Sequence, residues 1–343
     1  MLFVETSADV PFLEHDRGDV WLPVALILAM RRGERLVLAD PISDARRAAL
    51  GEIQDLFLSW YPDRMTRVRV RAPRSDAPRG VGQRLRRLAR GAGRRRGAGT
   101  CFTGGVDSFY TLLTNEVDAL VYAFGLDIPL DRRAASRRVD AELRSIAAQT
   151  GLTYLWLRTN LRHELAHQVS WGYETHGAVL ASLGAVLSPR LSSLRIPATH
   201  THEAGIPWGS HPQLDPLWTT DRLTMIHDGA EASRAAKVVR LADEPLAQRH
   251  LRVCYSQFRQ ANCGRCLKCL RTMATLELTG RLDRFETFPR PLDLDLLRSR
   301  ALRSPNDVFQ MRDVLRLAQT VPGYDDLTAA LAEMVSREPE GAL

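Results

Sequence analysis

The 343-residue sequence lacks the features that mark secreted and membrane proteins. Only five cysteines are present, and a chain of this length can bury a sizeable core without disulfide bonds. No apolar run approaches the roughly 20 residues of a membrane-spanning helix. The N-terminus, MLFVETSADV, has no basic start, apolar stretch or cleavage site of a secretory signal. We therefore expect a cytoplasmic protein with no membrane partner.

Three common nucleotide-binding and catalytic motifs are also missing. No Gly-Lys-Ser/Thr sequence follows the glycine pair at 104–105, so a Walker A loop is excluded, and GxGxxG does not occur. No GxSxG elbow is present, so Ser210, His211 and Asp215 do not form a hydrolase triad on this pattern.

The positive charge of the chain is concentrated in one segment. The formal net charge is +7, and residues 71–100 alone carry ten arginines and one aspartate. Residues 73–97 mix Arg, Gly and Pro with few large apolar residues, so they cannot pack a core and are expected to form a solvated linker. The alternative is that their guanidinium groups contact phosphates of RNA or of a nucleotide.

Apolar patterning predicts an α/β protein with a parallel, doubly wound sheet. Residues 98–250 alternate short apolar strands with helices, which is typical of a parallel sheet covered on both faces, with ligands at the carboxyl ends of its strands. Residues 1–72 form an N-terminal extension with strands at 34–40 and 66–72 and helices at 20–31 and 44–59, interpreted as a small α/β unit of its own. Residues 251–343 contain a cysteine cluster followed by helices.

The segment CFTGGVDS joins the first strand of this sheet to its first helix. Two adjacent glycines allow a tight turn with outward N–H groups, and Asp107 or Ser108 is expected to cap the helix. Such a loop at a positive helix end suits a phosphate. A purely structural turn is the alternative.

Four cysteines, Cys254, Cys263, Cys266 and Cys269, form the spacing Cys-x8-Cys-x2-Cys-x2-Cys. Closely spaced thiols in a cytoplasmic protein indicate a thiolate metal site, for which zinc and an iron–sulfur cluster compete. The fifth, Cys101, lies on an expected buried strand and is interpreted as a core residue.

Polar residues follow several of the expected strands and are candidate ligand contacts or loop caps. They are Asp127, Thr159, Asn160, Thr199, His200, Thr201 and His202. Residues 205–218 have neither helical nor strand periodicity and are expected to form a lid or substrate wall containing Ser210, His211 and Asp215. The sequence His227-Asp228-Gly229 is interpreted as a turn that could continue this wall.

The glycine loop resembles the SGGxDS loop of the PP-loop (N-type) ATP pyrophosphatases, with Thr103 in place of the usual serine. The resemblance implies their adenine-nucleotide-binding fold and contacts to ATP or Mg²⁺ from Thr103, Gly104, Gly105, Val106, Asp107 and Ser108. Asp127, at the end of the second expected strand, is a further candidate contact to the nucleotide because of its position. The resemblance also implies that Lys237 and Arg234 neutralise charge on the phosphates, although both could be exposed helix charges. The cysteine spacing is similar to the structural zinc site of the 7-cyano-7-deazaguanine synthase family.

Members of this family adenylate a carboxylate, release pyrophosphate and let ammonia displace AMP. The resemblance therefore implies an ATP-dependent C–N ligase with ATP, Mg²⁺ and Zn²⁺, giving an amide or a nitrile. Its substrate would be a small carboxylate, a peptide or a protein, with ammonia or an amine as donor, and a homodimer is possible. The alternatives are a tRNA-thiolating PP-loop enzyme, whose nucleic-acid partner is possible but not favoured, and a non-catalytic nucleotide-binding protein.

Overall fold

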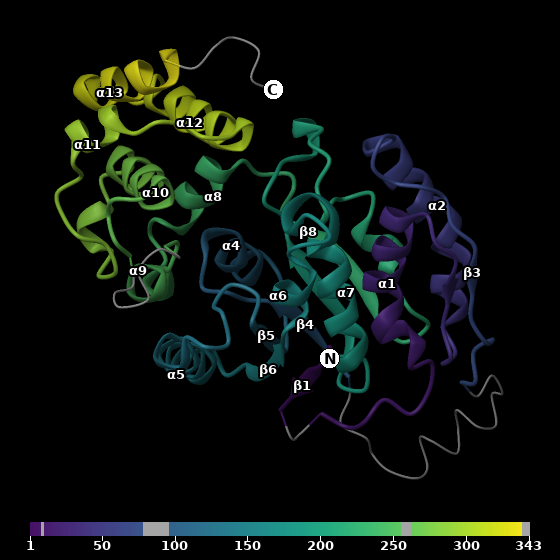
Figure 1. The fold of residues 1–343 in the computed structure, drawn as a ribbon. Coiled ribbons are helices and arrows are strands. Elements are labelled where there is room, and N and C mark those ends of the chain that lie inside the picture. Colours follow the sequence, from purple (N-terminus) through teal and green to yellow (C-terminus); the bar gives the residue numbers. More distant parts are fainter. Residues whose placement is uncertain (8–9, 78–95, 255–261, 338–343) are drawn as a thin grey trace.

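A six-stranded, mostly parallel sheet forms the centre of the molecule (Figure 1). The computed structural model describes residues 1–7, 10–77, 96–254 and 262–337. The strand order is β1-β6-β5-β4-β7-β8, and β1 alone is antiparallel to its neighbour. The strands are β1 (Val4–Thr6), β4 (Gly97–Cys101), β5 (Ala119–Phe124), β6 (Thr153–Thr159), β7 (Leu191–Pro197) and β8 (Thr224–Asp228). The expected α/β class is confirmed.

Helices cover both faces of this sheet. The α-helices are α1 (Gly18–Arg32), α2 (Asp44–Trp60), α4 (Val106–Thr114), α5 (Arg133–Thr150), α6 (Leu161–Leu165), α7 (His176–Leu187), α8 (Arg234–Leu241), α9 (Pro245–His250), α10 (Leu267–Leu278), α11 (Leu294–Ser299), α12 (Pro305–Ala318) and α13 (Asp325–Ser336). A π-helical turn η1 (Trp171–Thr175) precedes α7, and short 3₁₀ turns are η2 (His202–Ala204), η3 (Asp215–Trp218) and η4 (Leu282–Arg284). No helix in the described ranges is both long and apolar enough to cross a membrane.

Side chains of each central strand alternate between two cores because successive strand residues point to opposite faces. On β5, Val121 packs into the core under α7, whereas Leu120 and Tyr122 pack into the core under α4 and α5. Leu157 on β6 joins the α7 side and Trp156 the other side. Both faces are therefore apolar, which explains the nearly continuous apolar runs of these strands.

Buried side chains of the N-terminal segment belong to the same hydrophobic core as those of α7. This segment contains α1, α2 and a small parallel pair, β2 (Leu36–Val37) and β3 (Val70–Arg71). Helix α1 packs on α7, and the fully buried Arg46 donates hydrogen bonds to carbonyls of Asp19, Trp218 and Ala181. This guanidinium therefore links α2 to α1, η3 and α7.

The C-terminal helices make a third hydrophobic core beside the sheet. Helices α11, α12 and α13 pack together and against α10 and α8, which connect them to the rest of the molecule. The buried side chains of this core are largely aliphatic, such as Leu270, Met311 and Leu331.

Two strands differ from the sequence expectations. Strand β1 and strand β8 were not expected, and residues 227–228 end β8 instead of forming a turn. Most of the arginine-rich segment expected at 73–97 lies outside the described residues.

Candidate functional site

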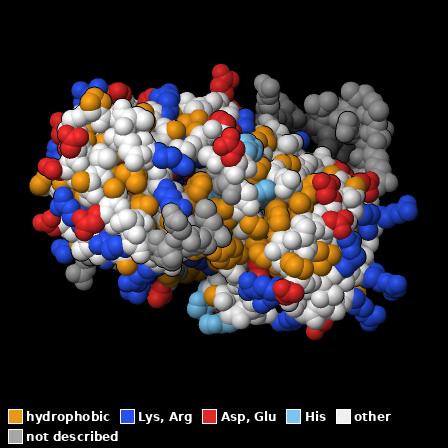
Figure 2. Space-filling view, turned by 90° about the horizontal axis from the view of Figure 1, so that it is seen from above, with side chains coloured by type: hydrophobic (Ala, Val, Ile, Leu, Met, Phe, Trp, Pro, Cys, Tyr) orange, Lys and Arg blue, Asp and Glu red, His pale blue; other side chains and the backbone are white. Residues whose placement is uncertain are grey.

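The order of the parallel strands reverses between β4 and β7. From β4 the chain adds β5 and β6 on one side, and then crosses to add β7 and β8 on the other. Open α/β sheets bind ligands at such a switch point, outside the carboxyl ends of the strands. A cavity of about 270 Å³ lies here, between the β4–α4 loop, the ends of β5 and β7, helix α7 and the C-terminal helices. Figure 2 views the molecule from the top of Figure 1 and shows hydrophobic side chains gathered across the middle of that face, with Lys and Arg side chains around them.

The glycine loop forms one wall of this cavity. Gly104 has a left-handed backbone with φ of 74°, so the chain turns sharply between β4 and α4. The Thr103 N–H donates to Ser108 Oγ at 3.3 Å, and the Ser108 hydroxyl donates to the Gly105 carbonyl at 2.9 Å. Helix α4 begins at Val106, so its first N–H groups have no acceptor within the helix.

Asp107 and Ser108 lie inside the first turn of α4, and neither caps it as expected. Gly105 occupies the capping position, and Asp107 is the second residue of the helix. Its carboxylate pairs with the Arg234 guanidinium at 2.8 Å and lies 3.7 Å from the Lys237 ammonium. The structure thus joins the expected loop to the two expected cations on α8.

Lys237 is buried, with 1% of its side chain exposed. Its ammonium donates to the Ala198 carbonyl at 2.7 Å, at the end of β7. Burial lowers the pKa of Lys237 from its ordinary value, and the nearby Asp107 carboxylate opposes this change. Lys237 is therefore not an exposed helix charge, and it ties α8 to the switch point.

Three further cations line the cavity and were missed by the sequence interpretation. Arg252 donates to the Thr103 carbonyl at 2.8 Å, and its own N–H donates to the Gly104 carbonyl at 2.8 Å. Lys268 and Arg271, on the first turns of α10, line the same cavity as Arg234. Burial and then the Arg234 charge lower the pKa of Lys268 to about 8 and that of Arg271 to about 10. The signal was the run CLKCLR, which places two basic residues three apart on one helical face.

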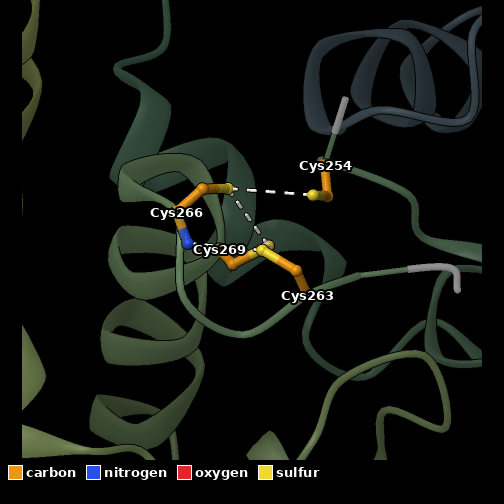
Figure 3. Close-up of side chains that lie close together, drawn as sticks. All are labelled: Cys254, Cys263, Cys266 and Cys269. Carbon is orange, nitrogen blue, oxygen red and sulfur yellow. Dashed lines mark hydrogen bonds between the residues drawn. The ribbon is translucent and has the colours of Figure 1, made fainter. Parts of the chain in front are cut away.

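The four clustered cysteines come together as expected (Figure 3). Their Sγ atoms all lie within 4.8 Å of one another, with 3.8 Å between Cys263 and Cys269 and 3.9 Å between Cys266 and Cys254. A tetrahedral zinc ion with bonds of about 2.3 Å separates its sulfurs by roughly 3.8 Å. The group can therefore hold one zinc ion, whereas a four-iron cluster, with one iron for each thiolate, needs a wider spacing.

Local backbone geometry supports a thiolate site. The N–H groups of Arg265 and Cys266 donate to Cys263 Sγ at 3.4 and 3.3 Å. Hydrogen bonding between Cys266 and Cys269 lowers the pKa of Cys266 to about 4 and raises the pKa of Cys269. Gly264 turns with φ of 68°, and a Cβ there would lie 2.3 Å from Pro289, so this turn requires glycine. With four protein ligands, a bound zinc ion would have no open position and would be structural.

A buried polar network lies behind the cavity. Asp215 is fully buried, accepts a hydrogen bond from the Ser210 hydroxyl at 2.7 Å, and its Oδ2 lies 2.7 Å from His227 Nδ1. Burial, and then the nearby Asp215 charge, raise the pKa of Cys101 to about 12. Cys101 lines the cavity as a protonated thiol, which agrees with a core role and not with a nucleophile.

Two tryptophans that line the cavity are held by a close approach of η1 to the loop 208–210. The Gly209 N–H donates to the Gly172 carbonyl at 2.8 Å, and the Gly177 N–H donates to the Gly209 carbonyl at 2.7 Å. A Cβ on Gly172 would lie 2.4 Å from the Trp208 ring. We call these contacts the glycine clasp. It places Trp171 and Trp208 at the cavity, and π-helical turns of this kind are frequent at functional sites.

Other expected site residues lie elsewhere or at the edge of the site. Asp127 and Thr199 line the cavity. Thr159 and Asn160 instead bind the N-terminal strand: the Thr159 hydroxyl donates to the Phe3 carbonyl at 2.7 Å, and Asn160 Oδ1 accepts from the Phe3 N–H at 3.1 Å. The expected wall 205–218 contributes Trp208 to the cavity, whereas His211 packs edge-on against Trp60. The His202 N–H, in turn, donates to the Ala230 carbonyl at 2.9 Å.

No family model, curated protein or solved structure matches this chain. The chemistry of the site is therefore inferred from its own residues.

Proposed function

We propose that this protein is an ATP-dependent ligase of the PP-loop type that adenylates a carboxylate and transfers the acyl group to ammonia or an amine. One observation carries the proposal: a glycine loop at the head of a helix, at the switch point of a parallel sheet, lines the same cavity as Arg234 and Arg252. Helix N-termini and guanidinium groups both bind phosphates. Together with Lys268 and Arg271, these cations outnumber the cavity carboxylates Asp107 and Asp127, as anionic ligands require.

In the proposed reaction, a carboxylate oxygen attacks the α-phosphorus of ATP and the bond to the β-phosphate oxygen breaks. Pyrophosphate leaves with that electron pair, and ammonia then attacks the acyl carbon, displaces AMP and loses a proton. The loop N–H groups and Thr103 would hold the leaving pyrophosphate. Arg234 and Lys237 would turn from Asp107 toward the phosphates, which frees the Asp107 carboxylate to hold Mg²⁺. Catalysis of this kind depends on positioning and charge neutralisation.

The proposal is tested by MgATP binding and by product formation. Wild-type protein is titrated with MgATP in a calorimeter, and Asp107→Asn is expected to lose most of the binding. Pyrophosphate and AMP are then measured with ammonium and a panel of carboxylates. Stoichiometric formation of both products supports a ligase, and absence of MgATP binding contradicts the proposal. Binding without turnover for any carboxylate favours the non-catalytic alternative.

The RNA alternative rests on the arginine-rich segment, most of which lies outside the described residues. Deleting residues 73–97 and measuring tRNA affinity addresses it separately. Equal and negligible affinities of the deletion variant and the full chain exclude this alternative.

A further inference from the structure

The cavity has an apolar inner wall that the phosphate chemistry does not use. Val121, Leu194 and Ile196 on the strands and Leu180 and Leu183 on α7 line it. These side chains belong to the hydrophobic core between the sheet and α7, so the cavity extends from the glycine loop into that core. We call this part the apolar recess.

Two polar side chains that line the cavity beside the apolar recess, Cys101 and His176, carry no charge at neutral pH. Burial keeps the pKa of the Cys101 thiol raised and lowers the pKa of His176 from its ordinary value. His176 packs against the Trp171 ring at 5.2 Å between ring centres. A ligand part that carries a charge, or many hydrogen-bonding groups, would be left unpaired in these surroundings, which is costly. The occupant of the recess is therefore apolar.

The same cavity has a cationic end, formed by Lys268 and Arg271, at which neither side chain pairs with Asp107. Arg234 and Lys237 already flank Asp107. Arg271 is 6% exposed, and within the described residues it forms no ion pair and its Nε has no hydrogen-bond partner. The Asp107 and Asp307 carboxylates act on Arg271 only from a distance, so this buried guanidinium without a direct ion pair favours a bound anion. Lys268 lies one turn away on the same face of α10.

We propose that the acid that is adenylated is a compact apolar monocarboxylate. Its hydrocarbon body lies in the apolar recess, and Lys268 and Arg271 hold its carboxylate. This inference rests on the proposed function and adds the substrate class to it. The size of the cavity limits the size of the acid. The whole cavity measures about 270 Å³, and an apolar cavity of about 150 Å³ holds a benzene ring. The body in the recess is therefore a short aliphatic chain or a single ring.

The test measures pyrophosphate release with MgATP, ammonium and acids of increasing apolar size: acetate, butyrate, hexanoate and benzoate, beside succinate and glutamate. We expect kcat/KM to rise about fourfold for each methylene buried, up to the size of the recess, and to be low for succinate and glutamate. A preference for the charged acids overturns the inference. So does a panel without any active acid in a protein that binds MgATP.

Two pairs of variants separate the recess from the cationic end. Leu183→Ala enlarges the recess and should move the preference to longer acids, whereas Leu187→Ala, one turn further along α7 and outside the cavity, should not. Because the preference is a ratio within one protein, partial unfolding does not alter it. Arg271→Met should raise KM for the acid about 10- to 100-fold, with the affinity for MgATP changed less than threefold. Arg240→Met, on the exposed face of α8, is its matched control.

The outcomes distinguish this inference from the proposed function. If Leu183→Ala changes MgATP affinity and leaves the acid preference unchanged, the recess holds the adenine and the inference is wrong. If Arg271→Met weakens MgATP as much as the acid, Arg271 serves the nucleotide and the inference is also wrong. In both cases the ligase proposal stands. If the wild-type protein does not bind MgATP, the proposed function itself fails.

Discussion

Arg234 is one of two α8 residues that pair with Asp107, which lies in the first turn of α4 after the glycine loop. Its guanidinium is mostly buried and pairs with Asp107 at 2.8 Å. Arg234→Met leaves this carboxylate without its nearest counter-charge and removes one phosphate-binding cation. We expect the dissociation constant of MgATP to rise about 10- to 100-fold, measured by calorimetry. Arg240→Met, on the exposed face of the same helix, should change it less than twofold, and an equal effect of both substitutions would contradict the role of Arg234.

His200 makes the stability of the protein depend on pH. Burial, and then the Arg234 charge, lower the pKa of His200 from 6.5 to about 4. Both ring nitrogens are buried without a hydrogen-bond partner in the part of the chain that the structure describes. The unfolded chain therefore takes up a proton near pH 6.5 that the folded protein accepts only near pH 4, so stability is lost as the pH falls between these values.

The expected loss from His200 alone is about 2 kcal/mol between pH 7 and pH 5. Urea unfolding of wild-type protein and His200→Phe at both pH values isolates it, because the other histidines are common to the two proteins. The ring neighbours of His200 are Trp208 and Phe309, which makes phenylalanine a reasonable replacement. An equal pH dependence of the two proteins would show that His200 is protonated equally in the folded and unfolded states.

At the scale of elements, the glycine clasp determines how close η1 and α7 lie to the loop 208–210. A Cβ on Gly177 would lie 2.3 Å from the Gly209 carbonyl oxygen and 2.5 Å from Asp215 Oδ1. Gly177→Ala is therefore expected to destabilise the protein by about 1–3 kcal/mol. Gly51, inside α2, has no atom within 4 Å of such a Cβ, so Gly51→Ala should stabilise the protein by about 0.5–1 kcal/mol. Chemical denaturation of both variants measures the difference, and effects of the same sign would contradict the clasp.

The elements that could be predicted from the sequence are those whose burial is indicated by the apolar pattern of their own residues. Strands β4 to β7 carry apolar runs because they are covered on both faces. The glycine motif before Asp107 predicts the loop between β4 and α4. Strand β1 is only three residues long, and it pairs through backbone groups with a strand about 150 residues away, so no local pattern marks it. The packing of the C-terminal region brings Arg252, Lys268 and Arg271 to the cavity. A local sequence motif cannot predict this packing.

At the scale of the whole molecule, the cysteine cluster lies between the sheet and the C-terminal helices. Cys266 immediately precedes α10, and Cys254 is two residues from Arg252. Loss of the metal should therefore displace cations of the cavity as well as lower stability. We expect Cys269→Ser to lose bound zinc, lower the melting temperature and weaken MgATP binding at least tenfold, because a structural zinc site contributes directly to folding.

Metal analysis and calorimetry check this prediction, with Cys101→Ser as the control outside the cluster. The control should keep one zinc ion per chain. If Cys269→Ser retains normal zinc content, the four cysteines are not the ligands. If it loses zinc but binds MgATP normally, the metal centre and the cavity are independent.

Strand β1 has a consequence for how the chain folds during synthesis. Residues 4–6 pair with residues 157–159, and α1 packs on α7, which ends at residue 187. Leu22, Leu26, Ile27 and Met30 of α1 are fully buried in the finished protein. At about 5–20 residues per second, a ribosome takes on the order of ten to thirty seconds to extend the chain from α1 to the end of α7. During that interval the hydrophobic face of α1 is exposed because α7 has not yet been synthesised. Chaperones at the ribosomal exit bind surfaces of this kind.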